Sequence, residues 1–310
     1  MRADPPTFVT TIGRGSSAHA CSYGAYMATA KLGVPAFPLP PSMVTLFASP
    51  LRMAGGLTLA VSQSGRSTDI VAALGACSAA GADTVAFVND ADSPLALLAR
   101  TTCPLHAGPE LSVAATKTFI TTLAALARFV GHWAGDASLL DGLKSLPEVL
   151  ETAQSTDLSP LVDLFGDRDR VQRALILGRG PGWPTALEAA LKLKEACSLQ
   201  AEAFTSAEVK HGPMALVGEG YPILMFATRG PAMADLIATA AEMRKMGATV
   251  FLMATDGSVG ADLVLPGAAD PWLDPLVIIQ AFHLAAERIA RARGLDPDSP
   301  PHLNKVTLTL

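Results

Sequence analysis

The chain has 310 residues, of which half are hydrophobic and 16% are charged, and its net charge is −5. This length predicts two domains of ordinary size, and the apolar composition excludes a disordered chain. The acidic balance and the lack of a basic run argue against a nucleic-acid partner, and no apolar run is long enough to cross a bilayer. The N-terminus lacks a signal pattern and the four cysteines lack CxxC spacing, so we expect a cytoplasmic protein with reduced cysteines.

Short apolar strands alternate with helices in the first half of the chain. Buried strands that are each followed by a helix predict a parallel sheet with helices on both faces. A more polar segment from about 136 to 170 is expected to be helical and to bridge to the second half. The strands are expected at 7–12, 57–61 and 84–88, and the helices at 17–32, about 68–80 and 112–134.

The pattern starts again near residue 170. A predicted strand at 173–177 ends in Gly178-Arg179-Gly180, as the first strand ends in Gly13-Arg14-Gly15, an offset of 165 residues. Gly81 and Gly247 each begin a similar run before a strand, at an offset of 166 residues. Two offsets that agree within one residue predict an internal duplication. The expected domains are 1–150 and 151–310.

A run of hydroxyl residues, Ser62-Gln63-Ser64-Gly65-Arg66-Ser67-Thr68, follows a predicted strand and opens a predicted helix. The backbone N–H groups at a helix N-terminus attract anions, and a glycine lets the backbone approach closely. We predict a phosphate-binding loop here, and an ordinary Ser/Thr-rich turn with an N-cap is the alternative. The corresponding run in the second half, Ala227 to Pro231, has few hydroxyls. One phosphate site per chain is therefore expected.

Three charged residues share one face of a helix predicted at 185–199. Glu188, Lys192 and Glu195 follow the spacing i, i+4 and i+7. Such a face is commonly solvated and held by a salt bridge. The functional alternative is a carboxylate beside a lysine that moves a proton between two carbons of a sugar.

Two further candidates lie in the second half. His211 precedes Gly212-Pro213 and could open a sugar ring by moving a proton near neutral pH, or could simply be exposed. Lys305 follows two prolines in the tail. A tail lysine is solvated by default, but one that folds back into a site could form a Schiff base with a carbonyl.

Several motifs in one order identify a family. The chain resembles the sugar isomerase (SIS) domain family, in particular the isomerase half of glutamine–fructose-6-phosphate amidotransferase (glucosamine-6-phosphate synthase) and its stand-alone aminosugar-phosphate relatives. The resemblance implies an α/β fold of two tandem SIS lobes, each a mostly parallel sheet between helices in a flavodoxin-like three-layer arrangement. The matching segments are Gly15-Ser16-Ser17, Ser62 to Gly65, Gly108-Pro109-Glu110, Val113 to Lys117, Ala186-Leu187-Glu188, Leu191 to Glu195 and Glu208 to Pro213.

The resemblance also implies roles for individual residues. Glu195 would move the proton between C1 and C2 with Lys192 beside it, and Lys305 would form a Schiff base with the open-chain ketose. His211 would help to open the ring from the neighbouring subunit, which implies a homodimer with a shared active site. The substrate would be held by Ser16, Ser17, Ser62, Gln63, Ser64, Ser67, Glu188 and the backbone of Val113.

The chain differs from the synthase pattern in two respects that bear on the expected reaction. The glutaminase half has no counterpart in these 310 residues, and Arg66 stands where an acidic residue is common in the family. We expect an aminosugar-phosphate deaminase/isomerase that converts glucosamine 6-phosphate or a close relative to fructose 6-phosphate and ammonia, without glutaminase activity. The alternatives are an aldose–ketose phosphosugar isomerase and a non-catalytic phosphosugar-binding regulator. Neither a metal nor a nucleotide cofactor is expected, because the histidines lack ligand spacing and Gly13-Arg14-Gly15 lacks a third glycine.

Overall fold

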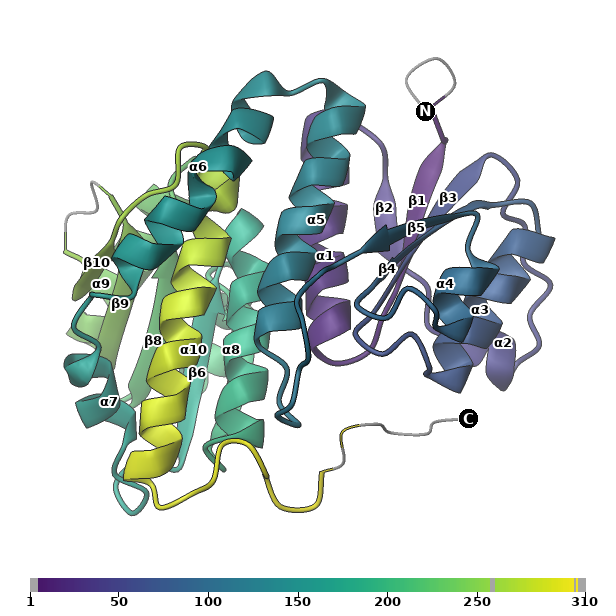
Figure 1. The fold of residues 1–310 in the computed structure, drawn as a ribbon. Helices are drawn as coiled ribbons and strands as arrows, with labels where there is room; N and C mark the ends of the chain where they lie inside the picture. Colours follow the sequence, from purple (N-terminus) through teal and green to yellow (C-terminus); the bar gives the residue numbers. More distant parts are fainter. Residues whose placement is uncertain (1–4, 257–259, 304, 306–310) are drawn as a thin grey trace. The chain divides into compact units, whose positions relative to one another are not determined.

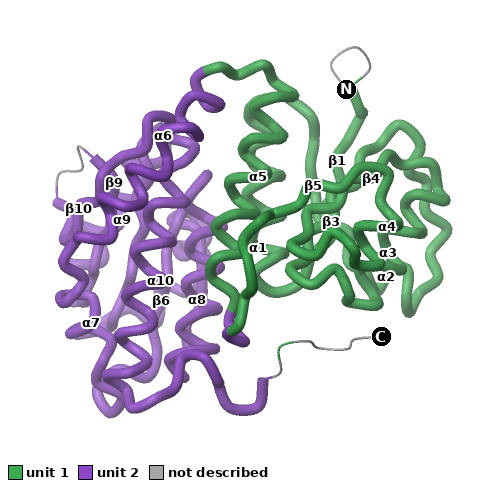
Figure 2. Tube along the Cα trace, viewed as in Figure 1, with its two compact units in different colours: residues 1–111, 115–137, 304–310 green, residues 112–114, 138–303 purple. Residues whose placement is uncertain are grey.

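The chain forms two compact units in the computed structural model, which describes residues 5–256, 260–303 and 305. Unit 1 comprises residues 1–111, 115–137 and 304–310, and unit 2 comprises residues 112–114 and 138–303 (Figure 2). None of the described helices has the length and apolar character that a membrane span needs.

Unit 1 is built on a sheet of five parallel strands in the order β2-β1-β3-β4-β5 (Figure 1). The central strand β3 is buried along its whole length, as a strand covered on both faces must be. The strands are β1 (Phe8–Ile12), β2 (Ala36–Pro38), β3 (Gly56–Ser62), β4 (Asp83–Val88) and β5 (Thr101–Pro104).

Helices cover both faces of this sheet. Alternate residues of a strand point to opposite faces. Ala60 packs in one core cluster with Ile70 and Leu74 of α3, whereas Phe87 meets Phe129 of α5 edge-on at a centroid distance of 5.7 Å. Helices α1 and α5 lie side by side (Figure 1). The helices of unit 1 are α1 (Ser16–Leu32), α2 (Ser42–Thr45), α3 (Thr68–Ala79), α4 (Pro94–Leu98) and α5 (Lys117–Ala134).

Unit 2 contains a second sheet of five parallel strands, in the order β10-β9-β8-β6-β7. Leu177 and Met225 pack with Leu236 of α9 on one face, and Phe226 meets Phe282 of α10 on the other at 5.8 Å. The strands are β6 (Arg173–Gly178), β7 (Gln200–Thr205), β8 (Pro222–Ala227), β9 (Thr249–Thr255) and β10 (Leu263–Leu265). The helices are α6 (Ala137–Ala153), α7 (Ser159–Phe165), α8 (Trp183–Glu195), α9 (Met233–Lys245) and α10 (Asp274–Ala292).

The two sheets have the same topology, which confirms the predicted duplication. In each, the first strand lies between the second and the third, so both sheets follow the order 2-1-3-4-5. In such a sheet the chain reverses its direction of winding between the first and third strands. Ligands bind in the crevice at the carboxyl ends of these two strands. In unit 1 the loops at this point are Gly13 to Ser17 and Ser62 to Thr68.

Two predicted helices have different limits in the structure. The helix expected at 112–134 begins only at Lys117, because the carboxylate of Glu110 accepts the first N–H groups of α5 and so marks its start. The helix expected at 185–199 ends at Glu195. Ser198 there has a φ of 48°, and the N–H of Leu199 turns back to the carbonyl of Leu193.

A buried carboxylate holds the loops of unit 2 together. Asp274, which is fully buried, accepts hydrogen bonds from Nε and Nη2 of Arg229 at 2.8 and 2.7 Å. It also accepts from the hydroxyl of Thr255 and from the N–H of Ala268. Arg229 follows β8, Thr255 is the last residue of β9, and Ala268 precedes α10. The side chain of Asp274 therefore links three segments.

Replacement of Asp274 by alanine is expected to destabilise the protein by about 3 kcal/mol, because the half-buried Arg229 guanidinium loses its anion. Urea unfolding followed by circular dichroism measures the change. Asp141→Ala is the matched control, because Asp141 forms an exposed i,i+3 pair with Lys144 and should leave the unfolding curve unchanged. Equal curves for the two variants would contradict the prediction.

Candidate functional site

The loop after β3 presents hydroxyl groups whose hydrogens are available as donors. The hydroxyl oxygen of Ser62 accepts the N–H of Gly65 at 3.0 Å, and that of Ser64 accepts the N–H of Arg66 at 3.3 Å. A hydroxyl that accepts in this way keeps its own hydrogen for another partner. Ser67 occupies the N-cap position of α3 without a side-chain bond to the helix. The loop is therefore suited to an acceptor-rich anion at the helix N-terminus.

Glycine is required at position 65. Gly65 has a φ of 63°, in the left-handed region that favours glycine. A Cβ atom there would lie 2.0 Å from the hydroxyl oxygen of Ser93, which is fully buried at the start of α4. The loop thus packs directly on the N-terminus of α4.

Arg66 is fixed by an ion pair at the surface of unit 1. Its Nη2 lies 2.7 Å from Oδ2 of Asp90, and both side chains are exposed. Hydrogen bonds from Arg66 and from the N–H of Asp92 hold the pKa of the Asp90 carboxyl below its usual value. The charge of Arg66 is therefore largely balanced by Asp90.

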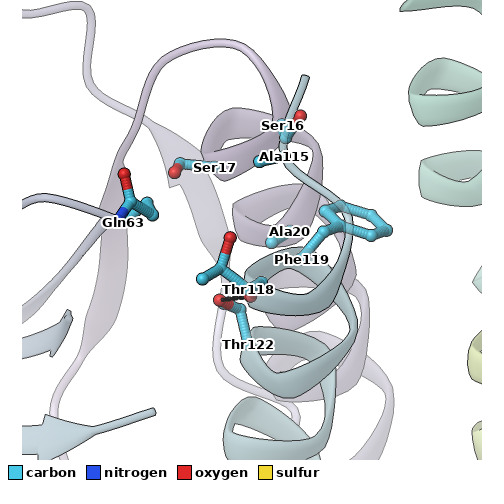
Figure 3. Close-up of a pocket in the computed structure, with 8 residues that line it drawn as sticks. All are labelled: Ser16, Ser17, Ala20, Gln63, Ala115, Thr118, Phe119 and Thr122. Carbon is cyan, nitrogen blue, oxygen red and sulfur yellow. Dashed lines mark hydrogen bonds between the residues drawn. The ribbon is translucent and has the colours of Figure 1, made fainter. Parts of the chain in front are cut away.

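A small cavity lies beside this loop, between the first turns of α1 and α5 (Figure 3). Three of the predicted substrate residues, Ser16, Ser17 and Gln63, line it. Ser62, Ser64 and Ser67 do not line this cavity. The remaining lining residues were not predicted as site residues: Ala20, Ala115, Thr118, Phe119 and Thr122.

The two threonines present acceptors to this cavity. The hydroxyl of Thr118 donates to Oε2 of Glu110 at 2.7 Å, and that of Thr122 donates to the carbonyl of Thr118 at 2.6 Å. A carboxylate and a carbonyl can only accept, so both hydroxyl hydrogens are committed and only oxygen lone pairs remain. Both side chains are buried.

The cavity and the adjacent loop thus differ in hydrogen-bonding character. The loop offers hydroxyl donors, and the wall formed by Thr118 and Thr122 offers acceptors. A ligand that joins an anion to hydroxyl or amino groups matches both. A clue to the threonine wall is present in the sequence: Glu110 lies just before a helix, and carboxylates are favoured at helix N-termini.

The charged face of α8 in unit 2 is buried, so its interpretation as a solvated face is wrong. The Nζ atom of Lys192 lies 2.6 Å from Oε2 of Glu195 and 3.4 Å from Oε1 of Glu188. Glu188 is fully buried, whereas the side chain of Glu195 is 23% exposed. His283 of α10, which was not predicted as a site residue, has Nε2 at 3.9 Å from Oε1 of Glu188. The four side chains form a polar cluster between two packed helices.

Lys192 remains charged inside this cluster. Burial acts to lower its pKa, but the carboxylates of Glu188 and Glu195 outweigh burial, so the pKa is raised above 10.5. One ammonium group therefore neutralises two carboxylates only in part. Glu195, the more exposed of the two, can meet a ligand with its second oxygen.

The remaining predicted residues belong to other segments of the chain. Val113 belongs to unit 2, and its N–H donates to the carbonyl of Asp298 at 3.3 Å. His211 is exposed at the end of a 3₁₀ turn. Lys305 is half-buried in the tail segment assigned to unit 1. Within the described residues, no group of three or more His, Cys, Asp or Glu side chains could hold a metal ion.

Sequence comparisons place the chain among known proteins. The SIS domain family model matches residues 9–130 and 169–259. The chain is 33% identical over 303 residues to a glutamine–fructose-6-phosphate aminotransferase (isomerizing) of Methanothermobacter thermautotrophicus, with 94% of this chain and 50% of that protein covered. The corresponding protein of Gloeobacter violaceus is 34% identical over 305 residues, with the same coverage. The chain thus spans about half the length of the curated relatives it matches.

Solved structures show the same architecture. A candidate phosphosugar isomerase from Silicibacter pomeroyi has a TM-score of 0.88 and 43% identity, with 96% of this chain and 90% of that chain covered. The C-terminal domain of glucosamine–fructose-6-phosphate aminotransferase from Francisella tularensis has a TM-score of 0.85 and 26% identity, with 95% and 87% covered. Glucosamine-6-phosphate deaminase from Thermotoga maritima has a TM-score of 0.81 with 99% and 92% covered, and at 23% identity it shows the fold alone.

Removal of the ammonium group from the α8 cluster is expected to destabilise unit 2. Lys192→Met leaves the buried Glu188 carboxylate without its cation and should cost about 3 kcal/mol in urea unfolding. Lys194→Met, at an exposed position of the same helix, is the control and should change little.

The pH dependence of this loss follows from the raised pKa. The contribution of Lys192 is fully present below its ordinary pKa of 10.5 and is lost as the pH rises through the folded value. The difference in the free energy of unfolding between wild type and Lys192→Met should therefore stay constant from roughly pH 7 to 9. A difference that already shrinks in this range would contradict a raised pKa.

Proposed function

This chain belongs to the SIS domain family, and we propose that it converts an aminosugar 6-phosphate, such as glucosamine 6-phosphate, to the ketose phosphate and ammonia. The observation that carries the proposal is Glu195, a partly exposed carboxylate held at 2.6 Å by the charged and buried Lys192. A fixed carboxylate with one oxygen free for a ligand is what a proton shuttle between neighbouring carbons requires. The match of both lobes to the SIS domain supports a sugar phosphate as the ligand.

The hydrogen-bonding character of unit 1 supports the same substrate class. The phosphate would accept from the hydroxyls of the Ser62 to Thr68 loop and from the first N–H groups of α3. The hydroxyl or amino groups of the sugar would donate to the oxygens of Thr118 and Thr122. Ser16, Ser17 and Gln63 would lie between the two ends of the ligand, since they line the same cavity.

The proposed reaction proceeds on the open-chain sugar. Glu195 removes the proton from C2 and returns it to C1 while a proton passes from the C2 nitrogen to the C1 oxygen, which converts the C2 amine to an imine and the C1 aldehyde to an alcohol. The amine of Lys305 adds to C2 and ammonia leaves, so a Schiff base replaces the imine. Water then releases the ketose phosphate and restores the lysine. One water is consumed and one ammonia is formed per turnover.

His211 is proposed to open the sugar ring from a second copy of the chain. Its position at an exposed turn is compatible with a role outside its own unit. This assignment makes the active enzyme a homodimer with a shared site.

An aldose–ketose phosphosugar isomerase is the second candidate. The 43% identity to a candidate phosphosugar isomerase favours it. The same loop and the same carboxylate would serve, because proton transfer between C1 and C2 is common to both reactions. Only the deaminase releases ammonia.

The deciding experiment is to incubate the purified protein with glucosamine 6-phosphate, without glutamine, and to measure ammonia and fructose 6-phosphate together. We expect both products in equal amounts. Interconversion of a ketose phosphate and an aldose phosphate without ammonia would favour the isomerase instead. Tight binding of a sugar phosphate with no turnover of either substrate class would contradict both enzymes.

Glu195→Gln is expected to lower kcat by about 10² or more, because the amide cannot carry the proton. Glu202→Gln is the control, since Glu202 is exposed on β7 and should retain the wild-type rate. Circular dichroism verifies that both variants are folded. An unchanged rate in Glu195→Gln would remove this residue from the mechanism.

A further inference from the structure

An ion pair joins the loop between β1 and α1 to the first turn of α3, at the carboxyl edge of the sheet of unit 1. Nε and Nη2 of Arg14 lie 2.9 and 2.8 Å from Oδ2 of Asp69. The side chain of Asp69 is fully buried, whereas that of Arg14 is 52% exposed. A carboxylate buried in this way is stable only with its cation in place.

The two partners belong to the two halves of the proposed phosphate site. Arg14 lies in the loop between β1 and α1, directly before Ser16 and Ser17. Asp69 lies in the first turn of α3, directly after the hydroxyl loop that ends at Ser67 and Thr68. The pair therefore connects the segment that carries Ser16 and Ser17 to the segment that follows the hydroxyl loop.

The pair also removes an unfavourable charge. A carboxylate in the first turn of α3 lies at the helix end where the phosphate is proposed to bind. Like charges at short range oppose each other strongly where water is excluded. Because the Arg14 guanidinium neutralises Asp69, the helix N-terminus stays available to a second anion.

The duplicated half contains the same pair. In unit 2, Nη1 of Arg179 lies 2.7 Å from Oδ2 of Asp235, which is in the first turn of α9. Arg179 follows Arg14 by 165 residues and Asp235 follows Asp69 by 166, the offsets of the internal repeat. The hydroxyl of Ser206 and the Arg179 guanidinium hold the pKa of Asp235 below its usual value.

Unit 2 nevertheless has few hydroxyls at the corresponding place, where Thr228 is the one hydroxyl residue of the run from Ala227 to Pro231. The loop after β6 is Gly180-Pro181-Gly182, and the guanidinium of Arg229 after β8 is committed to Asp274. The same pair thus occurs once beside a hydroxyl-rich loop and once without one. Arg179 is therefore a control for the effect of Arg14 on binding.

We propose that Arg14 is a positioning residue for phosphate binding: the Arg14–Asp69 ion pair holds the Ser16–Ser17 loop against the first turn of α3 and neutralises that turn for the anion. This inference rests on the proposed sugar-phosphate substrate. Arg14 acts through Asp69 and through the geometry of the loops, so it should affect affinity far more than the chemical step.

The test is isothermal titration of the full chain with fructose 6-phosphate and, separately, with inorganic phosphate. Arg14→Met should raise both dissociation constants about 10-fold or more, and Arg14→Lys should recover part of the loss. Arg179→Met should bind as wild type does, within about twofold. In a turnover assay, KM should rise with Arg14→Met while kcat changes less than about threefold.

A double variant distinguishes positioning from a general loss of stability. Arg14→Met combined with Asp69→Asn removes both charges, so no buried carboxylate is left without a cation. If Arg14→Met alone does not fold, the double variant is expected to stay folded. It should bind no more weakly than Arg14→Met, since both changes break one interaction. The inference is overturned if Arg14→Met binds as wild type does, if Arg179→Met weakens binding equally, or if the double variant binds more weakly than Arg14→Met. A wild-type protein that binds neither ligand would overturn the proposed function, and this inference with it.

Discussion

The order of the parallel strands is the constraint on which the rest of this structure depends. When strand 1 lies between strands 2 and 3, right-handed crossovers send the helices after strands 1 and 3 to opposite faces of the sheet. In unit 1, α3 therefore covers one face while α5 and its neighbour α1 cover the other. The loops after β1 and β3 are left side by side at the carboxyl edge, and both carry the residues of the candidate phosphate site.

At the same edge, some hydroxyl groups are available to a ligand as donors and others only as acceptors. Serine oxygens in the β3 loop accept backbone N–H groups, so their hydrogens remain as donors. Threonine hydroxyls of α5 donate to a carboxylate and to a carbonyl, so their oxygens remain as acceptors. The direction of each hydroxyl is set by its internal partner, and Glu110 is important because it sets the direction of Thr118.

Duplication has left the two lobes alike in backbone and different in chemistry. The arginine–aspartate pair occurs in both. In unit 2, however, Arg229 is committed to Asp274, and the charged side chains gather instead along α8. Burial makes that cluster sensitive to single changes, because Lys192 is the cation for two carboxylates in a place that water reaches poorly. The proposed function accordingly uses unit 1 for phosphate binding and Glu195 of unit 2 for proton transfer.

Much of the fold was predictable from local patterns. Alternating strands and helices, the two Gly-Arg-Gly turns and their constant offset predicted a duplicated parallel α/β chain, because strand burial and turn chemistry are local properties. Residue types alone made the phosphate loop and the charged helix candidates, whereas most individual side-chain roles came from the resemblance to a family and stay predictions.

Other features depend on groups that are distant in the sequence. The burial of the Glu188–Lys192–Glu195 face was missed, since spacing cannot show that α10 packs over it. His283 and Thr118 were missed because their partners, Glu188 and Glu110, come from another helix and from a preceding loop. The start of α5 shifted to Lys117 for the same reason, as the carboxylate of Glu110 defines it. Periodicity in a sequence reports which residues share a face, whereas burial and hydrogen-bond direction depend on what is packed against that face.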